Sequence, residues 1–151
     1  QMLVRMEISD EERLSKMELQ RRIHEAVLTG DDWDDIPPDM RKQADTPWFS
    51  SYLNFWPADV IQDLRQPMVV IHGGLDRQIV PGHADRLLEM GLARDRRVAT
   101  ELVRFDALNH LLVPAVTGEV NEYPTLETRS VSAELISALG EKLHKVMPSR
   151  R

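Results

Sequence analysis

Hydrophobic residues recur at the spacing of an amphipathic helix near the start of the chain. Ser9 and Glu12 have the spacing of a capping box, and Gly30 follows the last apolar position, so both ends of the helix carry signals. The pattern therefore predicts a helix over residues 10–28. Its apolar positions are Leu14, Met17, Leu19, Ile23, Ala26 and Val27.

Residues 31–66 lack a long periodic segment. Four aspartates and two prolines in residues 31–38 predict a loop, because proline removes a backbone donor and aspartate favours turns. Two shorter patterns predict helices over residues 39–44 and 59–64. We therefore interpret residues 1–66 as one helical, cap-like segment.

The second half of the chain alternates strand and helix patterns. Residues 68–72 form a short apolar run between a proline and two glycines, which is typical of a strand buried on both faces of a parallel sheet. A helical stripe begins at Pro81, and residues 100–105 predict a second strand. Strand, helix and strand within ~40 residues predict a βαβ unit with parallel strands. With a last helix expected over residues 132–146, residues 67–151 form a βαβα segment of the α/β class.

Polar side chains follow both predicted strands. Asp76 lies in the turn after the first strand, and His110 lies in the turn after the second. Since the carboxyl ends of parallel strands meet at one edge of a sheet, where catalytic groups are often placed, we expect the two side chains to lie together. A carboxylate beside an imidazole holds the ring in one tautomer and stabilises its protonated form, so that the ring acts as a general base. The alternatives are a turn aspartate that binds its own backbone and a histidine that caps a strand end.

The two turns resemble the C-terminal part of serine enzymes with the α/β-hydrolase fold. The segment from His72 to Pro81 is similar to their HGxxDxxVP-like turn, and the segment from Phe105 to His110 is similar to the strand, turn and Asn-His that follow it. The resemblance extends over roughly residues 45–147. It implies an α/β-hydrolase parallel sheet, esterase- or peptidase-like acyl transfer, and catalytic roles for Asp76 as the acid and His110 as the general base of a triad.

The chain departs from this family pattern in two places. Ala107 stands where relatives often have glycine, and no serine lies in a G-x-S-x-G motif, the turn that presents the nucleophile in this fold. His72 and its two glycines lead directly into the acid turn, so they do not form the early oxyanion loop of lipases. We expect the nucleophile to lie outside this chain and the chain to be the C-terminal portion of a longer enzyme, which its start at Gln1 also fits. The serines present are Ser9, Ser15, Ser50, Ser51, Ser130, Ser132, Ser137 and Ser149.

Five of the eight aromatic residues lie within residues 48–56. In the hydrolase interpretation this segment resembles the cap that precedes the acid strand, and Trp48, Phe49 and Tyr52 are expected to bind substrate by lining an apolar pocket. The alternative is that the rings only pack cap helices against the sheet. Residues 117–123, which follow the histidine, form either the rim of the site or an ordinary loop.

The composition limits the partners. A net charge of −6 and a pI near 5.4 argue against a nucleic-acid surface, and we interpret the densest basic run, Arg94, Arg96 and Arg97, as a solvated loop because Asp95 interrupts it. No apolar stretch approaches the ~20 residues that cross a bilayer, so we expect a soluble protein without membrane contact, in a compartment that the sequence leaves open. Without cysteine there is no disulfide or thiolate metal site, and we expect no cofactor and no metal.

Two functional hypotheses follow from these observations. The first is a part of a serine hydrolase that cleaves a small ester or peptide through an acyl-enzyme and that needs the missing N-terminal part of the same enzyme as its partner. The second is a non-catalytic binding or assembly module derived from a hydrolase fold, because a two-stranded sheet with an unpaired edge invites pairing with a partner or self-association. An upstream G-x-S-x-G motif would distinguish the two.

Overall fold

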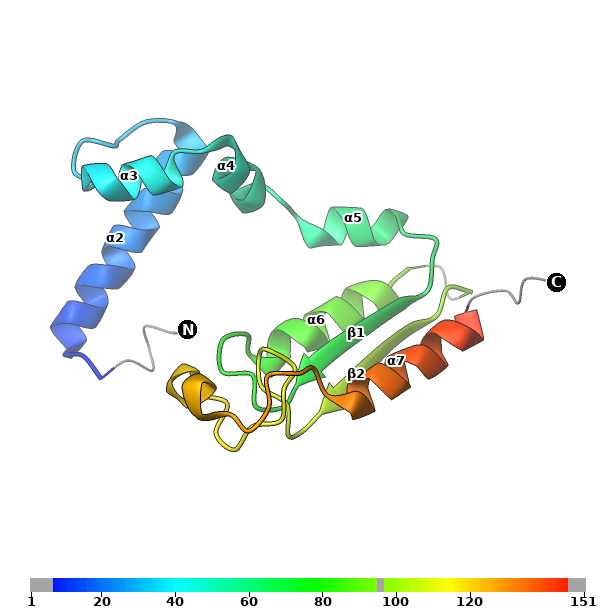
Figure 1. Cartoon of the computed structure of the whole chain (residues 1–151). Helices are drawn as coiled ribbons and strands as arrows, with labels where there is room; N and C mark the ends of the chain where they lie inside the picture. Colours follow the sequence, from blue (N-terminus) through cyan, green and yellow to red (C-terminus); the bar gives the residue numbers. More distant parts are fainter. Residues whose placement is uncertain (1–6, 95–96, 147–151) are drawn as a thin grey trace. The chain divides into compact units, whose positions relative to one another are not determined.

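The structure, a computed structural model, describes residues 7–94 and 97–146, and it divides into two compact units (Figure 1). The first unit, Gln1–Pro57, contains α2 (Asp10–Thr29), α3 (Pro38–Ala44) and α4 (Pro47–Leu53). The second unit, Ala58–Arg151, contains all of α5 (Pro57–Asp63) except its first residue. It also contains β1 (Met68–Gly73), α6 (Pro81–Leu92), β2 (Thr100–Phe105), the 3-10 helix η1 (Val120–Thr125) and α7 (Ala133–Val146).

The predicted first helix is confirmed as α2, and both of its ends use the expected signals. The Ser9 hydroxyl accepts a hydrogen bond from the Glu12 N–H at 3.1 Å, and Gly30 ends the helix in the left-handed conformation at φ 84°. The predicted apolar stripe, however, is buried only toward its C-terminal end. Leu14 and Met17 are exposed, because α3 and α4 pack only near the last turns of α2.

The core of the first unit forms where the three helices meet. Ala26 and Val27 of α2 pack with Ala44 of α3 and with two residues of the acidic loop, Trp33 and Ile36. The burial of these two loop residues explains why a segment rich in aspartate and proline is ordered. Partly buried residues of α2 and α4 complete the cluster: Ile23, Phe49 and Leu53.

Helix α4 is an element that the sequence pattern did not predict. Its sequence signal is Thr46 followed by Pro47, since the Thr46 hydroxyl accepts from the Phe49 N–H at 3.2 Å and proline is favoured in the first helical turn. Its seven residues make about two turns, so the hydrophobic spacing is a weak signal here and the residues at its start are the stronger one.

The second unit is built on a two-stranded parallel sheet, as predicted. The strands pair in register from Met68 opposite Thr100 to Gly73 opposite Phe105. Alternate residues of each strand face opposite sides. Ile71 and Phe105 pack with Leu135 of α7, while Gly91 of α6 lies against Met68 and Thr100, so the two helices cover opposite faces of the sheet, as Figure 1 shows.

Arg94 is inside the second unit, which contradicts its interpretation as part of a solvated loop. Its side chain is buried. Its guanidinium group donates hydrogen bonds to backbone carbonyls just after α5, just before β1, in the last turn of α6 and just before β2. Burial is possible because each donor of the guanidinium fork finds an acceptor. The acceptors are the carbonyl oxygens of Leu64, Gln66, Gly91 and Ala99 and the hydroxyl of Thr100. The Asp95 and Arg96 positions lie outside the described residues.

Candidate catalytic site

The two predicted turns lie against each other at the carboxyl end of the sheet. The Gly74 N–H donates to the Phe105 carbonyl at 2.8 Å, and the Leu75 N–H donates to the Leu108 carbonyl at 2.9 Å. A side chain on Gly73 would place its Cβ 2.4 Å from the Leu108 carbonyl oxygen, which is closer than atoms can approach. The two glycines of this turn are therefore required by close approach of two backbones, rather than by a left-handed conformation.

Asp76 projects from the first turn and uses its two carboxylate oxygens differently. Oδ1 accepts from the N–H groups of Gln78 at 2.9 Å and Ile79 at 2.8 Å. Oδ2 lies 3.0 Å from Nδ1 of His110. The turn-forming role and the pairing with histidine, which the sequence presented as alternatives, are thus combined in one side chain.

The surroundings of Asp76 favour its charged form. Burial by itself would raise the pKa of this carboxyl group, since its side chain is 9% exposed. The hydrogen bonds from the Ile79 N–H, from His110 and from the Gln78 N–H act in the opposite direction, and together they lower the pKa of Asp76 below its ordinary value. The carboxylate is therefore ionised at neutral pH and presents only acceptors to the ring.

His110 stands at the tip of a short turn that Asn109 holds in shape. Asn109 is fully buried, and its Oδ1 accepts from the N–H groups of Leu111 at 2.9 Å and Val113 at 3.2 Å. The turn also contains Leu112 at a positive φ of 58°, and a bridge between Leu108 and Pro114 closes it. The Asn of the Asn-His pair in the sequence therefore builds the turn that presents the imidazole.

The pairing with Asp76 assigns the tautomer of His110. Because the carboxylate only accepts, Nδ1 of the ring carries the shared proton and donates it, which leaves Nε2 as the basic nitrogen. The His110 side chain is 37% exposed, so the ring is open to a reacting group while its partner carboxylate is buried. This is the arrangement in which an aspartate orients a histidine for general-base catalysis.

His72 belongs to the frame of the site. It lies in β1, is 5% exposed, and donates from Nε2 to the Ile79 carbonyl at 3.1 Å. The N–H of the same Ile79 donates to Asp76, so His72 braces the acid turn through the backbone of one residue. The His-Gly-Gly sequence before the acid therefore contributes a brace and two close backbone contacts.

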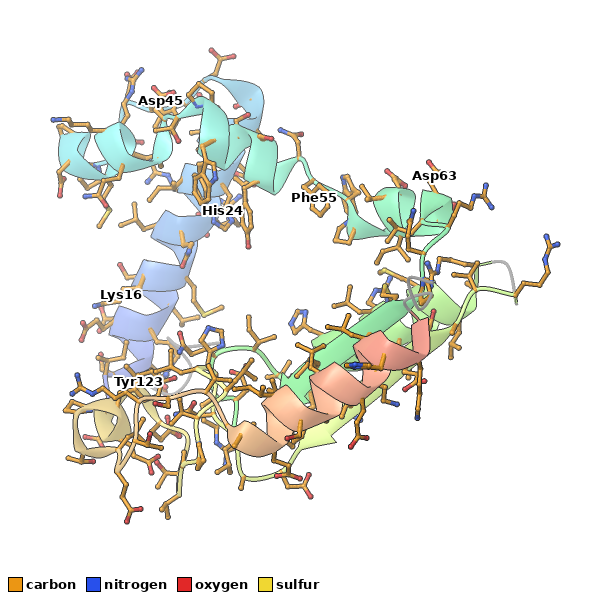
Figure 2. All side chains as sticks on the ribbon, turned by 45° about the vertical axis from the view of Figure 1, so that its right-hand side comes forward. Lys16, His24, Asp45, Phe55, Asp63 and Tyr123 are labelled. Carbon is orange, nitrogen blue, oxygen red and sulfur yellow. The ribbon has the colours of Figure 1, made fainter. Side chains whose placement is uncertain are left out.

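The predicted substrate-binding residues belong to the other unit. Trp48, Phe49 and Tyr52 lie on α4, where the Trp48 and Tyr52 rings stack at 5.7 Å between centroids. Trp48 and Tyr52 are exposed, at 73% and 63%, whereas Phe49 packs edge-on against His24, which is labelled in Figure 2. Part of this segment thus serves the core of the first unit, and part is an exposed aromatic surface.

Residues 117–123, expected to form either the rim of the site or an ordinary loop, contain one polar residue whose own role the sequence did not single out. Glu122 of η1 binds the backbone of residues 116–118 with its carboxylate. Two of these residues contact the acid turn, Thr117 at Arg77 and Gly118 at Leu75. The local signal of Glu122 is the Thr117-Gly118 pair four to five positions earlier, since threonine and glycine often form turns that bind an anion. Among the described residues no group of three histidine or acidic side chains has the geometry of a metal site.

Comparisons of the chain with protein-family models, with curated proteins and with solved structures gave no match. Within the described parts of the chain, no helix combines the length and the apolar character that crossing a membrane requires. The geometry of Asp76 and His110 is therefore the basis of the function proposed below.

Proposed function

We propose that this chain supplies the acid and the general base of an α/β-hydrolase-like serine hydrolase that cleaves a carboxylic ester or an amide. The single observation that carries the proposal is the 3.0 Å contact between Asp76 Oδ2 and His110 Nδ1. The two residues follow adjacent parallel strands in the order acid and then histidine, which is the order that this fold uses.

In the proposed reaction, Nε2 of His110 accepts the proton of a serine hydroxyl as the serine oxygen attacks the substrate carbonyl carbon. The ring, now positively charged, is stabilised by Asp76 and passes the proton to the leaving alcohol or amine as the bond to it breaks. A water molecule activated by the same nitrogen then hydrolyses the acyl-enzyme. The serine is proposed to come from outside residues 1–151, since none of the eight serines lies in a nucleophile motif.

A non-catalytic assembly module remains the second candidate, and one observation favours it. Trp48, Tyr52, Phe55 and Trp56 are all more than half exposed, and such a collection of rings is typical of a surface that a partner covers. This candidate predicts that Asp76 and His110 can be replaced without loss of function.

Substitutions in the intact enzyme that contains this chain test the hydrolase proposal. His110→Ala removes the proton acceptor, and Asp76→Asn keeps the size of the side chain but favours the wrong tautomer, a change that costs ~10⁴-fold in turnover in the best-described serine protease triad. We expect hydrolysis of a chromogenic ester to fall by a similar factor while circular dichroism and melting stay close to wild type. His83→Ala, at an exposed position on α6, is the matched control.

A variant that keeps more than about a tenth of wild-type turnover, a barrier change below ~1.4 kcal/mol, would remove that residue from the triad. The nucleophile is tested separately by treating the 151-residue chain with a fluorophosphonate probe. We expect no labelling. Stoichiometric labelling at one serine, with Ser50 and Ser51 examined first, would show that the nucleophile is within the chain.

A further inference from the structure

Residues 116–123, which we call the strap, form a loop that one carboxylate closes. The carboxylate of Glu122 accepts hydrogen bonds from the N–H groups of Val116 at 2.7 Å, Thr117 at 3.0 Å and Gly118 at 2.7 Å. It also accepts from the Thr117 hydroxyl at 2.6 Å. Four donors on one carboxylate make Glu122 the centre of the strap.

The strap is attached to the turn that carries Asp76 at both of its ends. Near its start, Nε of Arg77 donates to the Thr117 carbonyl at 3.1 Å. At its end, Nε2 of Gln78 donates to the hydroxyl of Tyr123 at 2.8 Å, and Tyr123 is labelled in Figure 2. Arg77 and Gln78 are the two residues that directly follow Asp76 in the chain.

Backbone contact brings the strap still closer to the acid turn. Gly118 adopts a positive φ of 75°, and a Cβ on it would lie 1.8 Å from the Leu75 carbonyl oxygen. No side chain can therefore be accommodated at Gly118 while the strap is in place. Leu75 directly precedes Asp76, so the strap contacts the acid turn on both sides of the carboxylate residue.

We propose that Glu122 is a positioning residue for the Asp76–His110 pair. Glu122 holds the strap closed, and the strap holds Arg77 and Gln78. The Gln78 N–H in turn donates to Asp76 Oδ1, which directs Oδ2 toward His110. That these contacts assist catalysis rests on the proposed function. The contacts themselves are part of the fold.

The charge of Glu122 fits this role. The Thr117 hydroxyl and the N–H groups of residues 116–118 bind the ionised form, and they lower the pKa of Glu122 to about 2. The carboxylate therefore stays charged, with all of its lone pairs available as acceptors, throughout the neutral range. A glutamine at this position would have one acceptor oxygen in place of two and would turn an NH₂ group toward the backbone donors.

The proposal is tested by NMR on the ¹⁵N-labelled 151-residue chain, with the His110 Nδ1–H proton as the readout. The variants are Glu122→Gln, Tyr123→Phe, which cuts the attachment to Gln78 from the other end, and the control Glu127→Gln, which removes one charge from an exposed position farther along the chain. His110→Asn assigns the signal. In Glu122→Gln and Tyr123→Phe we expect this proton to exchange with water at least about tenfold faster than in wild type, the effect of losing one modest hydrogen bond. Glu127→Gln should exchange like wild type.

Asp76→Asn distinguishes a failure of the proposed Asp76–His110 pair from a failure of the positioning role of Glu122. If this variant leaves the His110 signal unchanged, the Asp–His pair is not formed and the proposed function fails. If it removes the signal while Glu122→Gln and Tyr123→Phe leave it unchanged, with the amide spectrum of β1 and β2 preserved, only the positioning role of Glu122 is overturned. Should Glu122→Gln unfold the chain, Tyr123→Phe alone decides, since it removes a single hydroxyl group.

Discussion

Single side chains in the second unit combine tasks that look like alternatives in the sequence. Asp76 forms its own turn with one oxygen and pairs with His110 with the other. Asn109 forms the turn that presents the histidine. Arg94 likewise has a second role, because its charged guanidinium group links several backbone segments by hydrogen bonds.

We predict that Arg94→Met lowers the free energy of unfolding by about 2–4 kcal/mol, because several buried or partly buried carbonyl oxygens lose their donor. Arg94→Lys should recover only part of the loss, since an ammonium group cannot reach acceptors in the directions that the planar fork reaches. Urea unfolding followed by circular dichroism measures both. Arg86→Met, at an exposed position on α6, is the matched control and should change stability by less than about 0.5 kcal/mol.

At the scale of elements, the site depends on close contact between the turns that follow β1 and β2. The contact is direct, backbone to backbone, and the parallel register sets it by placing Gly73 opposite Phe105. The strap adds a third segment to the same region. The relative position of the Asp76 and His110 side chains is therefore fixed by contacts among three loops, two of which directly follow the strands.

We predict that Gly73→Ala destabilises the second unit by about 1–3 kcal/mol and separates the two turns, because the new methyl group meets the backbone of Leu108 and Asn109. Gly140→Ala is the matched control. Gly140 lies in α7 with nothing within 4 Å of the position of a Cβ, so alanine there should stabilise the chain by ~0.5–1 kcal/mol through the unfolded state. Thermal melting compares the pair. Equal effects of the two substitutions would contradict the close contact.

The strap should respond to acid in a defined window. Its carboxylate has a pKa of about 2 in the folded chain against an ordinary 4.5, so the folded state binds its proton less readily than the unfolded state. The stabilisation by Glu122 is therefore fully present above pH 4.5 and is lost as the pH falls toward 2. We expect the amide signals of residues 116–118 to lose protection over this range, measured by NMR at stepped pH. In Glu122→Gln the same amides should be insensitive to pH there, and an unchanged wild-type titration would contradict this assignment.

At the scale of the whole molecule, each unit has a small core and a considerable apolar surface. The sheet formed by the described residues has two strands and hence two outer edges with backbone groups that can pair with another strand. In the first unit, Trp48 and Trp56 are 73% and 70% exposed. Two-stranded sheets and exposed aromatic groups both favour association.

We predict that the 151-residue chain self-associates. Sedimentation velocity over a range of concentrations should show an average mass that rises with concentration, and melting should be broad. Trp48→Ser, at an exposed position, should reduce association without loss of secondary structure. A monodisperse monomer with one sharp, cooperative melting transition would show that the chain is an independent domain.

The elements that could be predicted from the sequence are those with a clear period or clear end signals. Helix α2, both strands and α7 fall close to their expected bounds, because capping residues, apolar runs and stripes act over a few neighbouring positions. Helix α4 was missed because its hydrophobic spacing is weak over about two turns and its signal lies in its first residues, Thr46 and Pro47. The parallel pairing was predictable as well, since a strand, helix and strand of this length join in that way.

By itself the sequence determined the two turns after the strands and the presence of an acid in one and a histidine in the other. Only the tertiary structure decided that the two side chains meet, because their contact depends on strand register and on backbone approach between residues 34 positions apart. It also decided that Arg94 is buried, that Leu14 is exposed and that Glu122 closes the strap. These outcomes depend on which surfaces pack together, and local patterns contain no information about packing between distant segments.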